Sequence, residues 1–386
     1  MRRSFILLVL LLWPQWVLAQ KSTVSIMSED SLVTEDPVQS SLVPVFGYQS
    51  DAGFIGGAVW QRIDYESEQF DFRNVTSMGL TASTMGHLSG QFDHERTESF
   101  GGGVRSRYRV ELFRIPNQTY FGIGNSTTFD PDLYKEGWYD FMERSFRFHY
   151  SGRVGLSDSR AAGELDVQFL LSVSGYSPRP AGEESLFEGT TPAGYKGGWA
   201  NRIGAGLIMD RRDSEFNPTR GFRLESSLSG AGGVTLSQYR FGLYLMDGRS
   251  YIPLGRDLVI AQRVELQHTF GETPFQEMPT LGSELALRGY ALNRFRAYTS
   301  LHHQLELRSW LFSVLNEEIR FGAQLFMDTG RVFSERESLL DLPDGLKQTF
   351  GVGGAMSLFN PDFIFRGELG FSDELYRIYI GIGYLF

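Results

Sequence analysis

Cysteine is absent from the 386-residue chain, which excludes disulfides, thiolate chemistry and a lipid-modified cysteine after a leader. Basic residues are also in deficit: 36 lysines and arginines stand against 46 aspartates and glutamates, and they form no cluster. Because nucleic-acid binding needs a basic face, this balance excludes nucleic acid as a partner class. Cofactor chemistry has no visible anchor either, because the glycine-rich stretches at Tyr120–Ser126 and near Gly381 precede no helix.

Long apolar runs are missing after the first twenty residues, so no later segment predicts a membrane-spanning helix. The start of the chain does have an apolar run, from Phe5 to about Leu18, preceded by Arg2 and Arg3. Together with the small residue Ala19, this pattern predicts a secretory signal peptide over residues 1–19. The paired arginines also fit a twin-arginine leader, but the strongly apolar run favours the general secretory route.

Residues 20–42 form a short acidic segment without apolar periodicity, and we expect it to be a loosely attached periplasmic segment. From residue 43 to residue 386 the pattern changes to an alternation of apolar and polar residues, rich in aromatics and glycine. This period of two predicts β-strands with one apolar and one charged face. The final stretch is the clearest case, and we interpret its apolar face as a carboxyl-terminal assembly signal formed by Tyr376, Ile378, Ile380, Ile382, Tyr384 and Phe386.

About sixteen strands can be marked over residues 43–386, with long connections only after odd-numbered strands. A soluble β-sandwich would show the same alternation. The leader, the aromatic residues at strand ends and the terminal phenylalanine favour an all-β transmembrane antiparallel barrel in a bacterial outer membrane. In such a barrel the long loops lie outside and both termini lie in the periplasm.

The longest connection contains LRGY, Leu287 to Tyr290, and the next two predicted strands carry Glu306 and Asp328 on their inward faces. If the loop folds into the lumen, Arg288 can pair with one or both carboxylates in a partly desolvated place. The alternative is a solvated arginine in an external loop. Gly289 would permit the bend, and Tyr290 would pack beside it.

The order of these motifs, LRGY followed by FMDTG, with DRRDSEFNPTRG before them and a terminal aromatic, resembles the bacterial surface antigen barrel of the BamA/TamA and two-partner-secretion transporter superfamily. The resemblance covers about residues 42–386 and implies sixteen strands with the long loop in the lumen. It implies that partners in the lumen lock the loop tip, and that a periplasmic turn motif has an architectural role. Leu287 in the tip stands where valine or isoleucine is common in the family. The positions that match are, for the tip, Leu287, Arg288, Gly289 and Tyr290; for the partners, Glu306, Phe326, Asp328 and Gly330; for the turn, Asp210, Arg212, Asp213, Pro218 and Gly221.

Members of that superfamily that insert or secrete proteins carry periplasmic POTRA domains before the barrel, and residues 20–42 are too few to fold one. The resemblance implies a role in outer-membrane biogenesis, as protein insertion, translocation or lipid handling, through a weak seam between the first and last strands. Gly381 and Gly383 fit such a seam because they remove packing from the last strand. Expected partners are outer-membrane lipids, the barrel-assembly machinery, and a separate periplasmic protein or secreted client.

A passive outer-membrane pore is the alternative function, because charged inward faces could line a channel. Enzymatic activity is not expected. His302 and His303 are neighbours on one predicted strand, so they face opposite sides and cannot serve one catalytic or metal site together.

Overall fold

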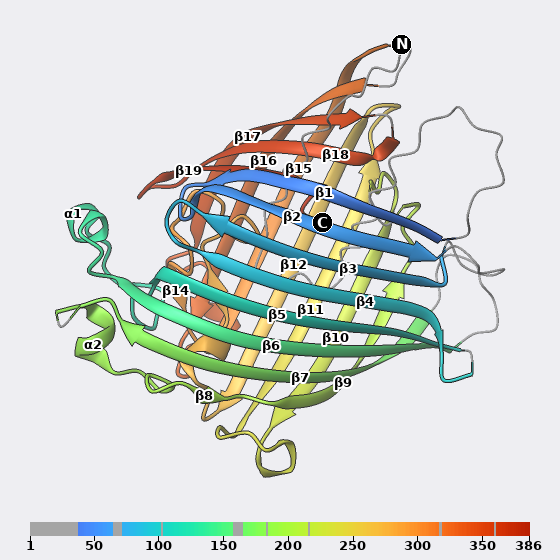
Figure 1. Ribbon diagram of the computed structural model, residues 1–386. Helices are drawn as coiled ribbons and strands as arrows, with labels where there is room; N and C mark the ends of the chain where they lie inside the picture. The colour runs from blue at the N-terminus through green and yellow to red at the C-terminus, as the bar shows by residue number, and fades with distance from the viewer. Residues whose placement is uncertain are drawn as a thin grey trace.

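Sixteen long strands close into an antiparallel barrel in the part of the chain that the structure describes (Figure 1). This computed structural model describes residues 38–64, 72–101, 103–156, 165–182, 184–214, 217–315, 319–358 and 360–386. The barrel strands are β1 (Val38–Gln49), β2 (Gly53–Asp64), β3 (Asn74–Ser83), β4 (Leu88–Ser99), β5 (Val104–Thr119), β6 (Asp140–Gly155), β7 (Leu165–Pro180), β9 (Arg202–Asp210), β10 (Gly221–Ala231), β11 (Phe241–Pro253), β12 (Leu258–Gly271), β15 (Thr299–Val314), β16 (Ile319–Phe333), β17 (Lys347–Leu358), β18 (Asn360–Phe371) and β19 (Tyr376–Ile382).

Short elements belong to the loops: α1 (Pro131–Lys135), α2 (Leu186–Thr190), β8 (Gly198–Trp199), and the two-stranded hairpin of β13 (Thr280–Leu281) with β14 (Phe295–Arg296). None of the helices among the described residues is long and apolar enough to cross a membrane.

The predicted all-β barrel of about sixteen strands is confirmed. Its first strand begins at Val38 rather than at residue 43, so residues 38–42 lie in β1 and not in the acidic segment. Pairing with β2 explains the difference, because Ser40 and Ser41 lie opposite Arg62 and Gln61 in a backbone ladder that needs no apolar side chains. The signal peptide and residues 20–37 lie outside the described residues.

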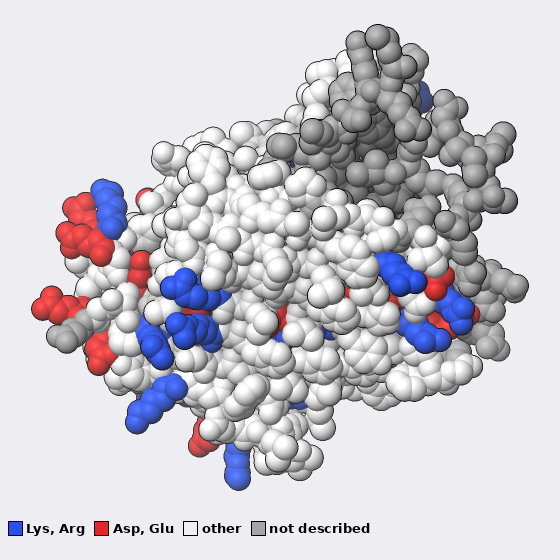
Figure 2. Space-filling model, in the orientation of Figure 1, with Lys and Arg blue, Asp and Glu red and all other residues white. Residues whose placement is uncertain are grey.

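The outer wall of the barrel is apolar and the inner wall is charged, the reverse of a soluble protein. Leu80 and Phe54 are 72% and 69% exposed, whereas Glu306 and Asp328 are fully buried. Figure 2 shows charged side chains gathered toward the two ends of the barrel, with a mostly uncharged band between them. This distribution matches a lipid-facing belt flanked by two polar interfaces.

The two ends of the barrel differ in their connections. At the loop end lie the long connections 120–139, 181–201, 272–298 and 334–346; at the turn end β1 starts and β19 stops. An aromatic cluster packs beneath the loops, where the Phe187 ring of α2 lies 4.6 Å from Phe141 and 5.3 Å from Phe275. The loops therefore form a packed layer over that end of the barrel.

The end of the chain departs from the predicted alternation. β19 stops at Ile382, and Gly383 has a positive φ of 74° that turns the backbone out of the strand. Tyr384 and Phe386 are consequently buried, and the Arg308 guanidinium lies 4.0 Å from the Tyr384 ring centroid. The expectation that both aromatics continue the outward apolar face of β19 is therefore wrong. Tyr376 and Ile378 are exposed and Ile380 is half-buried, while the side chain of Ile382 lies outside the described residues.

Candidate functional site: the loop tip in the lumen

Arg288 lies inside the barrel against the wall of β15, β16 and β18, carried there by the loop between β12 and β15. Its side chain is completely buried. Asp328 of β16 receives three hydrogen bonds from it, from the backbone N–H at 3.0 Å, from Nε at 2.9 Å and from Nη2 at 2.6 Å. This bidentate pairing fixes the plane of the guanidinium.

Two further carboxylates complete the surroundings of Arg288. Its Nη1 lies 2.6 Å from Glu306 Oε1 on β15 and 3.2 Å from Glu368 Oε1 on β18. Each of these carboxylates also binds a second arginine, since Glu306 pairs with Arg308 at 2.7 Å and Glu368 pairs with Arg366 at 2.8 Å. Three arginines thus face three carboxylates in a buried cluster, which we call the lock (Arg288, Glu306, Arg308, Asp328, Arg366 and Glu368).

Aromatic packing supports the same guanidinium from its flat side. The Arg288 Cζ lies 3.5 Å from the centroid of the Phe326 ring on β16, a cation–π contact in a desolvated place. The Phe326 ring in turn lies over Gly351 of β17, where a Cβ would come within 2.0 Å of the ring. Gly330 leaves similar room for Leu281 of the loop, whose Cδ1 would lie 3.1 Å from an added Cβ.

Gly289 brings the loop backbone against β18 and β19. Its φ is 108°, and an added Cβ would lie 2.8 Å from the carbonyl carbon of Phe371. Its N–H donates to the Tyr379 hydroxyl at 3.1 Å, and its carbonyl accepts from the Ser372 hydroxyl at 3.1 Å. Only glycine fits this approach, because every side chain would meet the β18 backbone.

Tyr290 and Leu287 anchor the loop on either side of the tip. The Tyr290 hydroxyl donates to Asp373 at 2.5 Å, and its ring packs edge-on to Phe295 with centroids 5.0 Å apart. Leu287 is fully buried in the cluster that Tyr290, Phe295 and Val332 also form, and it adopts a left-handed φ of 56°. This conformation is costly for leucine, so the surrounding contacts must hold it.

The electrostatics of the tip follow from this burial. Burial alone would lower the pKa of Arg288, but attraction to Asp328, Glu306 and Glu368 outweighs it and holds that pKa well above its usual range. Burial, followed by the hydrogen bond to Asp373, raises the pKa of Tyr290. Arg288 is therefore a permanent cation, and its charge is balanced only by carboxylates on strands far apart in the sequence.

The structure brings all the predicted tip and partner residues together. Four other participants were not expected from the sequence: Arg308, Arg366, Glu368 and Tyr379. Glu368 closes the carboxylate triad, and Tyr379 binds the Gly289 N–H. Both side chains lie on inward faces. Glu368 alternates with the outward side chains of Phe365 and Leu369, and Tyr379 alternates with those of Ile378 and Ile380. The period-two pattern gave the direction of these side chains, but not that β18 and β19 approach the loop tip.

The predicted turn motif lies apart from the tip, at the turn end between β9 and β10. Asp213 accepts the Thr219 N–H at 2.9 Å and the Arg220 N–H at 3.1 Å, which closes the turn. Asp210 pairs with Arg212 at 2.7 Å. Pro218 is buried in this turn, and at Gly221, where φ is 104°, an added Cβ would lie 2.0 Å from the Arg211 carbonyl oxygen.

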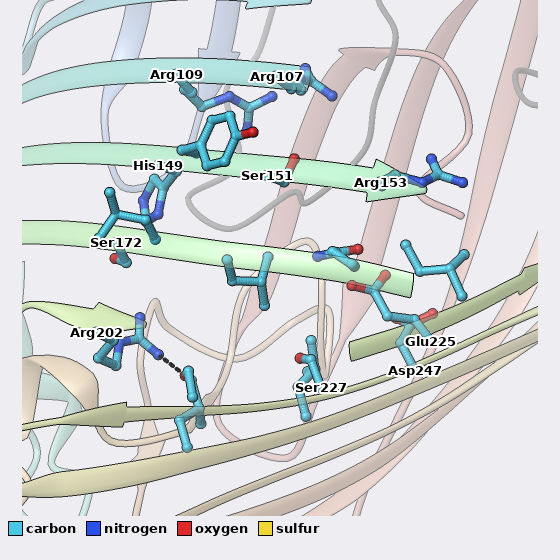
Figure 3. A pocket seen from close by; sticks show the side chains of 18 of the residues that line it. Arg107, Arg109, His149, Ser151, Arg153, Ser172, Arg202, Glu225, Ser227 and Asp247 are labelled. Carbon is cyan, nitrogen blue, oxygen red and sulfur yellow. Dashed lines mark hydrogen bonds between the residues drawn. The ribbon is translucent and has the colours of Figure 1, made fainter. Parts of the chain in front are cut away.

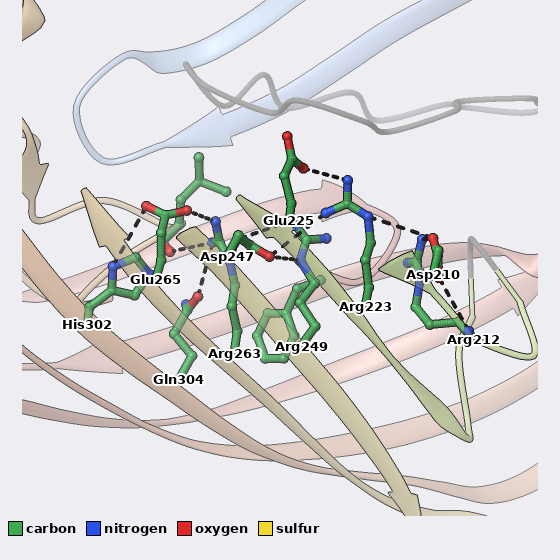
Figure 4. A network of polar contacts seen from close by, with 12 residues as sticks. Asp210, Arg212, Arg223, Glu225, Asp247, Arg249, Arg263, Glu265, His302 and Gln304 are labelled. Atoms are coloured by element: carbon green, nitrogen blue, oxygen red, sulfur yellow. Dashed lines mark hydrogen bonds and ion pairs between the residues drawn. The ribbon is translucent and has the colours of Figure 1, made fainter. Parts of the chain in front are cut away.

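A chain of ion pairs continues from this turn along the inner wall (Figure 4). Arg223 lies 3.7 Å from Asp210 and 2.6 Å from Glu225, and Arg263 lies 2.6 Å from Asp247. These residues come from β9, β10, β11 and β12, so the pairs run across neighbouring strands. They tie these strands together on the lumen side.

The same wall borders a cavity of about 220 Å³ (Figure 3). Its described lining contains nine arginines and five carboxylates, an excess of positive charge in a chain that is acidic as a whole. Arg202 Nε and Arg223 Nη1 are buried without a hydrogen bond among the described residues. A cavity of this polarity has room and partners for water.

A closed sixteen-stranded barrel with an arginine-tipped loop locked in its lumen defines a class of outer-membrane barrel. The chain belongs to the Omp85 superfamily, whose domain model matches residues 66–386. No curated protein matches the chain.

Solved structures of this class share the fold. BamA from Haemophilus ducreyi lacking POTRA domains 1–3 superposes with a TM-score of 0.60 at 14% identity, over 91% of this chain and 71% of that one. CdiB from Escherichia coli gives 0.61 at 10% identity, over 92% of this chain and 64% of that one. CdiB from Acinetobacter baumannii gives a TM-score of 0.55 at 10% identity, over 90% of this chain and 60% of that one. The chain thus spans less than two thirds of both CdiB chains.

Proposed function

We propose that this chain acts in outer-membrane biogenesis by passing hydrophobic or unfolded polypeptide clients through a seam between β1 and β19, with both termini in the periplasm. The single observation that carries the proposal is the shortness of the pairing there. Among the described residues β1 and β19 share one ladder pair, Gln49 opposite Tyr379. By contrast, β1 pairs with β2 over its whole length, from Val38 to Gln49.

The seam is held at the loop end and loosely paired toward the turn end. Arg377 of β19 lies 3.0 Å from Asp51, and the Ile378 N–H donates to Ser50 at 3.3 Å. Beyond Tyr379 the last strand continues only to Ile382, after which Gly383 turns the chain into the lumen. Most of the β1 edge thus has no strand partner on this side among the described residues, so its backbone groups could pair with a client strand, as in β-strand addition.

The lock supports this mechanism because it holds together the strands on the β19 side of the seam. Loop residues Arg288 and Gly289 contact β15, β16, β18 and β19 at once. Opening at the seam can then occur by movement of β1 and its hairpin partner β2. A passive pore is less well supported, since the loop lies inside the lumen.

A disulfide across the seam tests the proposal, and the absence of native cysteine gives a clean background. Residues opposite each other in an antiparallel ladder have the Cα separation that a disulfide needs, about 4.5–5.5 Å. The Gln49→Cys/Tyr379→Cys variant should lose function when oxidised and regain it when reduced. Each single variant is a matched control, and Tyr379→Cys alone also reports the loss of the Tyr379 contact to Gly289. Full activity of the oxidised double variant would exclude the seam.

The client class is tested by quantitative proteomics of outer membranes from a strain lacking this chain, beside a complemented strain. A joint fall of many barrel proteins would indicate general assembly. A fall of one exported protein would identify a dedicated transporter, whereas unchanged protein levels would reject polypeptide clients altogether.

A further inference from the structure

A groove of about 890 Å³ lies on the outer wall of the barrel, away from the lumen and the seam. It crosses β2 to β8 near the loop end, and its floor is formed where glycines stand between large apolar side chains. Gly90 lies between Leu80 and Leu112, and the Trp199 ring lies over Gly175 at 3.0 Å from the position of an added Cβ. The groove exists because the glycines in its floor have no side chains to fill it.

Arginines border this groove on the side of the loop end. Arg114 of β5 lies directly opposite Arg144 of β6, and both line the groove. Arg179 of β7 is exposed and stands diagonally to Arg144, since it pairs with Met142, at a distance of about 7–8 Å that long side chains can bridge. These three residues form the arginine rim.

The arginine rim is unusual because like charges directly opposite each other destabilise a sheet. No ion pair joins Arg114, Arg144 or Arg179 to a carboxylate among the described residues. Arg114 donates to the Gly86 carbonyl at 3.2 Å, a neutral acceptor that leaves its charge unbalanced. In the lumen, by contrast, the opposed arginines Arg223, Arg249 and Arg263 have carboxylates beside them, Glu225 and Asp247. An anion between the two guanidiniums would turn this repulsion into a bridge.

The position of the rim selects the kind of anion. Immediately below it the wall is apolar, with Leu112 55% exposed and Leu80 72% exposed, so this part of the barrel faces acyl chains. Figure 2 shows basic side chains at the margin of the uncharged band near the loop end. A ligand that places negative charge at this level and hydrocarbon beneath it is a phosphorylated lipid.

We propose that the arginine rim and the groove form a binding site for a membrane lipid with a phosphorylated headgroup, in the leaflet at the loop end. Its phosphate bridges Arg114 and Arg144, with Arg179 within reach, and one acyl chain lies in the groove over Gly90, beside the Trp199 ring. The site does not depend on the seam or on the client of the barrel. It would anchor the wall formed by β4 to β7 in the bilayer.

The test is native mass spectrometry of the purified full chain released from detergent, with lipid A, a bisphosphorylated glycolipid, as the probe and phosphatidylcholine as the comparison lipid. We expect wild type to retain lipid A. The Arg114→Gln/Arg144→Gln variant should bind it about tenfold more weakly, as loss of charge-assisted contacts implies. Gly90→Leu fills the groove without changing charge and should weaken binding as well. Arg256→Gln, in an exposed turn at the other end, is the matched control.

Several results would overturn the site. Lipid A retention by the double variant at the wild-type level would remove the arginine rim from the proposal. Equal binding of phosphatidylcholine and lipid A would show a non-specific annular contact. If inorganic phosphate displaced all lipid A and Gly90→Leu bound lipid A as wild type does, the groove would take no acyl chain. Heat-modifiable migration in gels verifies that each variant is a folded barrel, so that weakened binding is not loss of fold.

Discussion

Arginines on the inner wall of the barrel have two kinds of surroundings, one at the loop tip and one around the cavity. Around the loop tip, Arg288, Arg308 and Arg366 are matched by three carboxylates and are fully buried or nearly so. On the rest of the inner wall, the strands from β4 to β12 line a cavity in which arginines outnumber carboxylates by nine to five. The same alternation of charged residues thus produces a charge-matched, buried cluster at the loop tip. Around the cavity it produces a wall with an excess of arginine, in which Arg105 and Arg153 are partly exposed whereas Arg202 and Arg223 are buried.

Burial determines how much free energy is lost when one partner of an ion pair is removed. A buried ion pair is costly to break because the remaining partner stays desolvated, whereas a pair beside water is readily resolvated. The lock should therefore dominate the stability of the barrel, although the cavity wall contains more charged residues. Single substitutions in the lock and in the cavity wall test this ranking.

Replacing Arg288 should have the largest effect. Arg288→Ala leaves Asp328, Glu306 and Glu368 buried without their shared cation, and we expect the free energy of unfolding to fall by about 3–5 kcal/mol. Denaturant titration of the folded barrel in detergent measures this change. Arg256→Ala, in an exposed turn, should leave it unchanged.

A double-mutant cycle of Arg288→Ala with Asp328→Asn then separates the pair from its surroundings. We expect a coupling energy of about 1–3 kcal/mol, because the two side chains share two direct hydrogen bonds. Strictly additive losses would contradict the lock as a cooperative unit.

A glycine substitution at the tip should have the next largest effect. Gly289→Ala places a methyl group 2.8 Å from the Phe371 carbonyl carbon and requires alanine at a φ of 108°, which we expect to cost about 1–3 kcal/mol. The charges of the lock are unchanged, so the loss would come from the backbone approach alone. Gly230→Ala is the control, because nothing lies within 4 Å of its added Cβ. If both variants were equally stable, the close approach of loop and β18 would be wrong.

The sequence predicted the barrel and three of the six lock residues, Arg288, Glu306 and Asp328, because a single periodicity determines both. Once strands alternate, Glu306 and Asp328 must face the lumen, and an arginine in the longest loop is their natural partner. Glu368 escaped the prediction because its approach to Arg288 depends on barrel curvature and on how far the loop descends. Neither quantity is encoded in local spacing.

The chain end shows where periodicity fails as a guide. Tyr384 and Phe386 fit the apolar face of the last strand in spacing, but Gly383 permits a left-handed turn that an alternating pattern cannot reveal. The Arg308 side chain then stabilises the inward path, since its Nη2 donates to the Phe386 carbonyl at 2.9 Å. The roles of the turn motif and of the terminal aromatics in assembly stay predictions.

The smallest effect is expected on the cavity side. Arg153 pairs with Asp166 at 2.6 Å, but about a quarter of the Arg153 side chain is exposed and it borders the cavity. Water can therefore replace the lost contact, and we expect Arg153→Gln to change the free energy of unfolding by less than about 1 kcal/mol. Arg366→Gln makes the same chemical change within the lock, where Glu284 would lose its cation and Glu368 would keep only Arg288. We expect Arg366→Gln to lower the free energy of unfolding several times more than Arg153→Gln does. Equal losses for the two variants in denaturant titrations would show that burial does not distinguish the lock from the cavity wall.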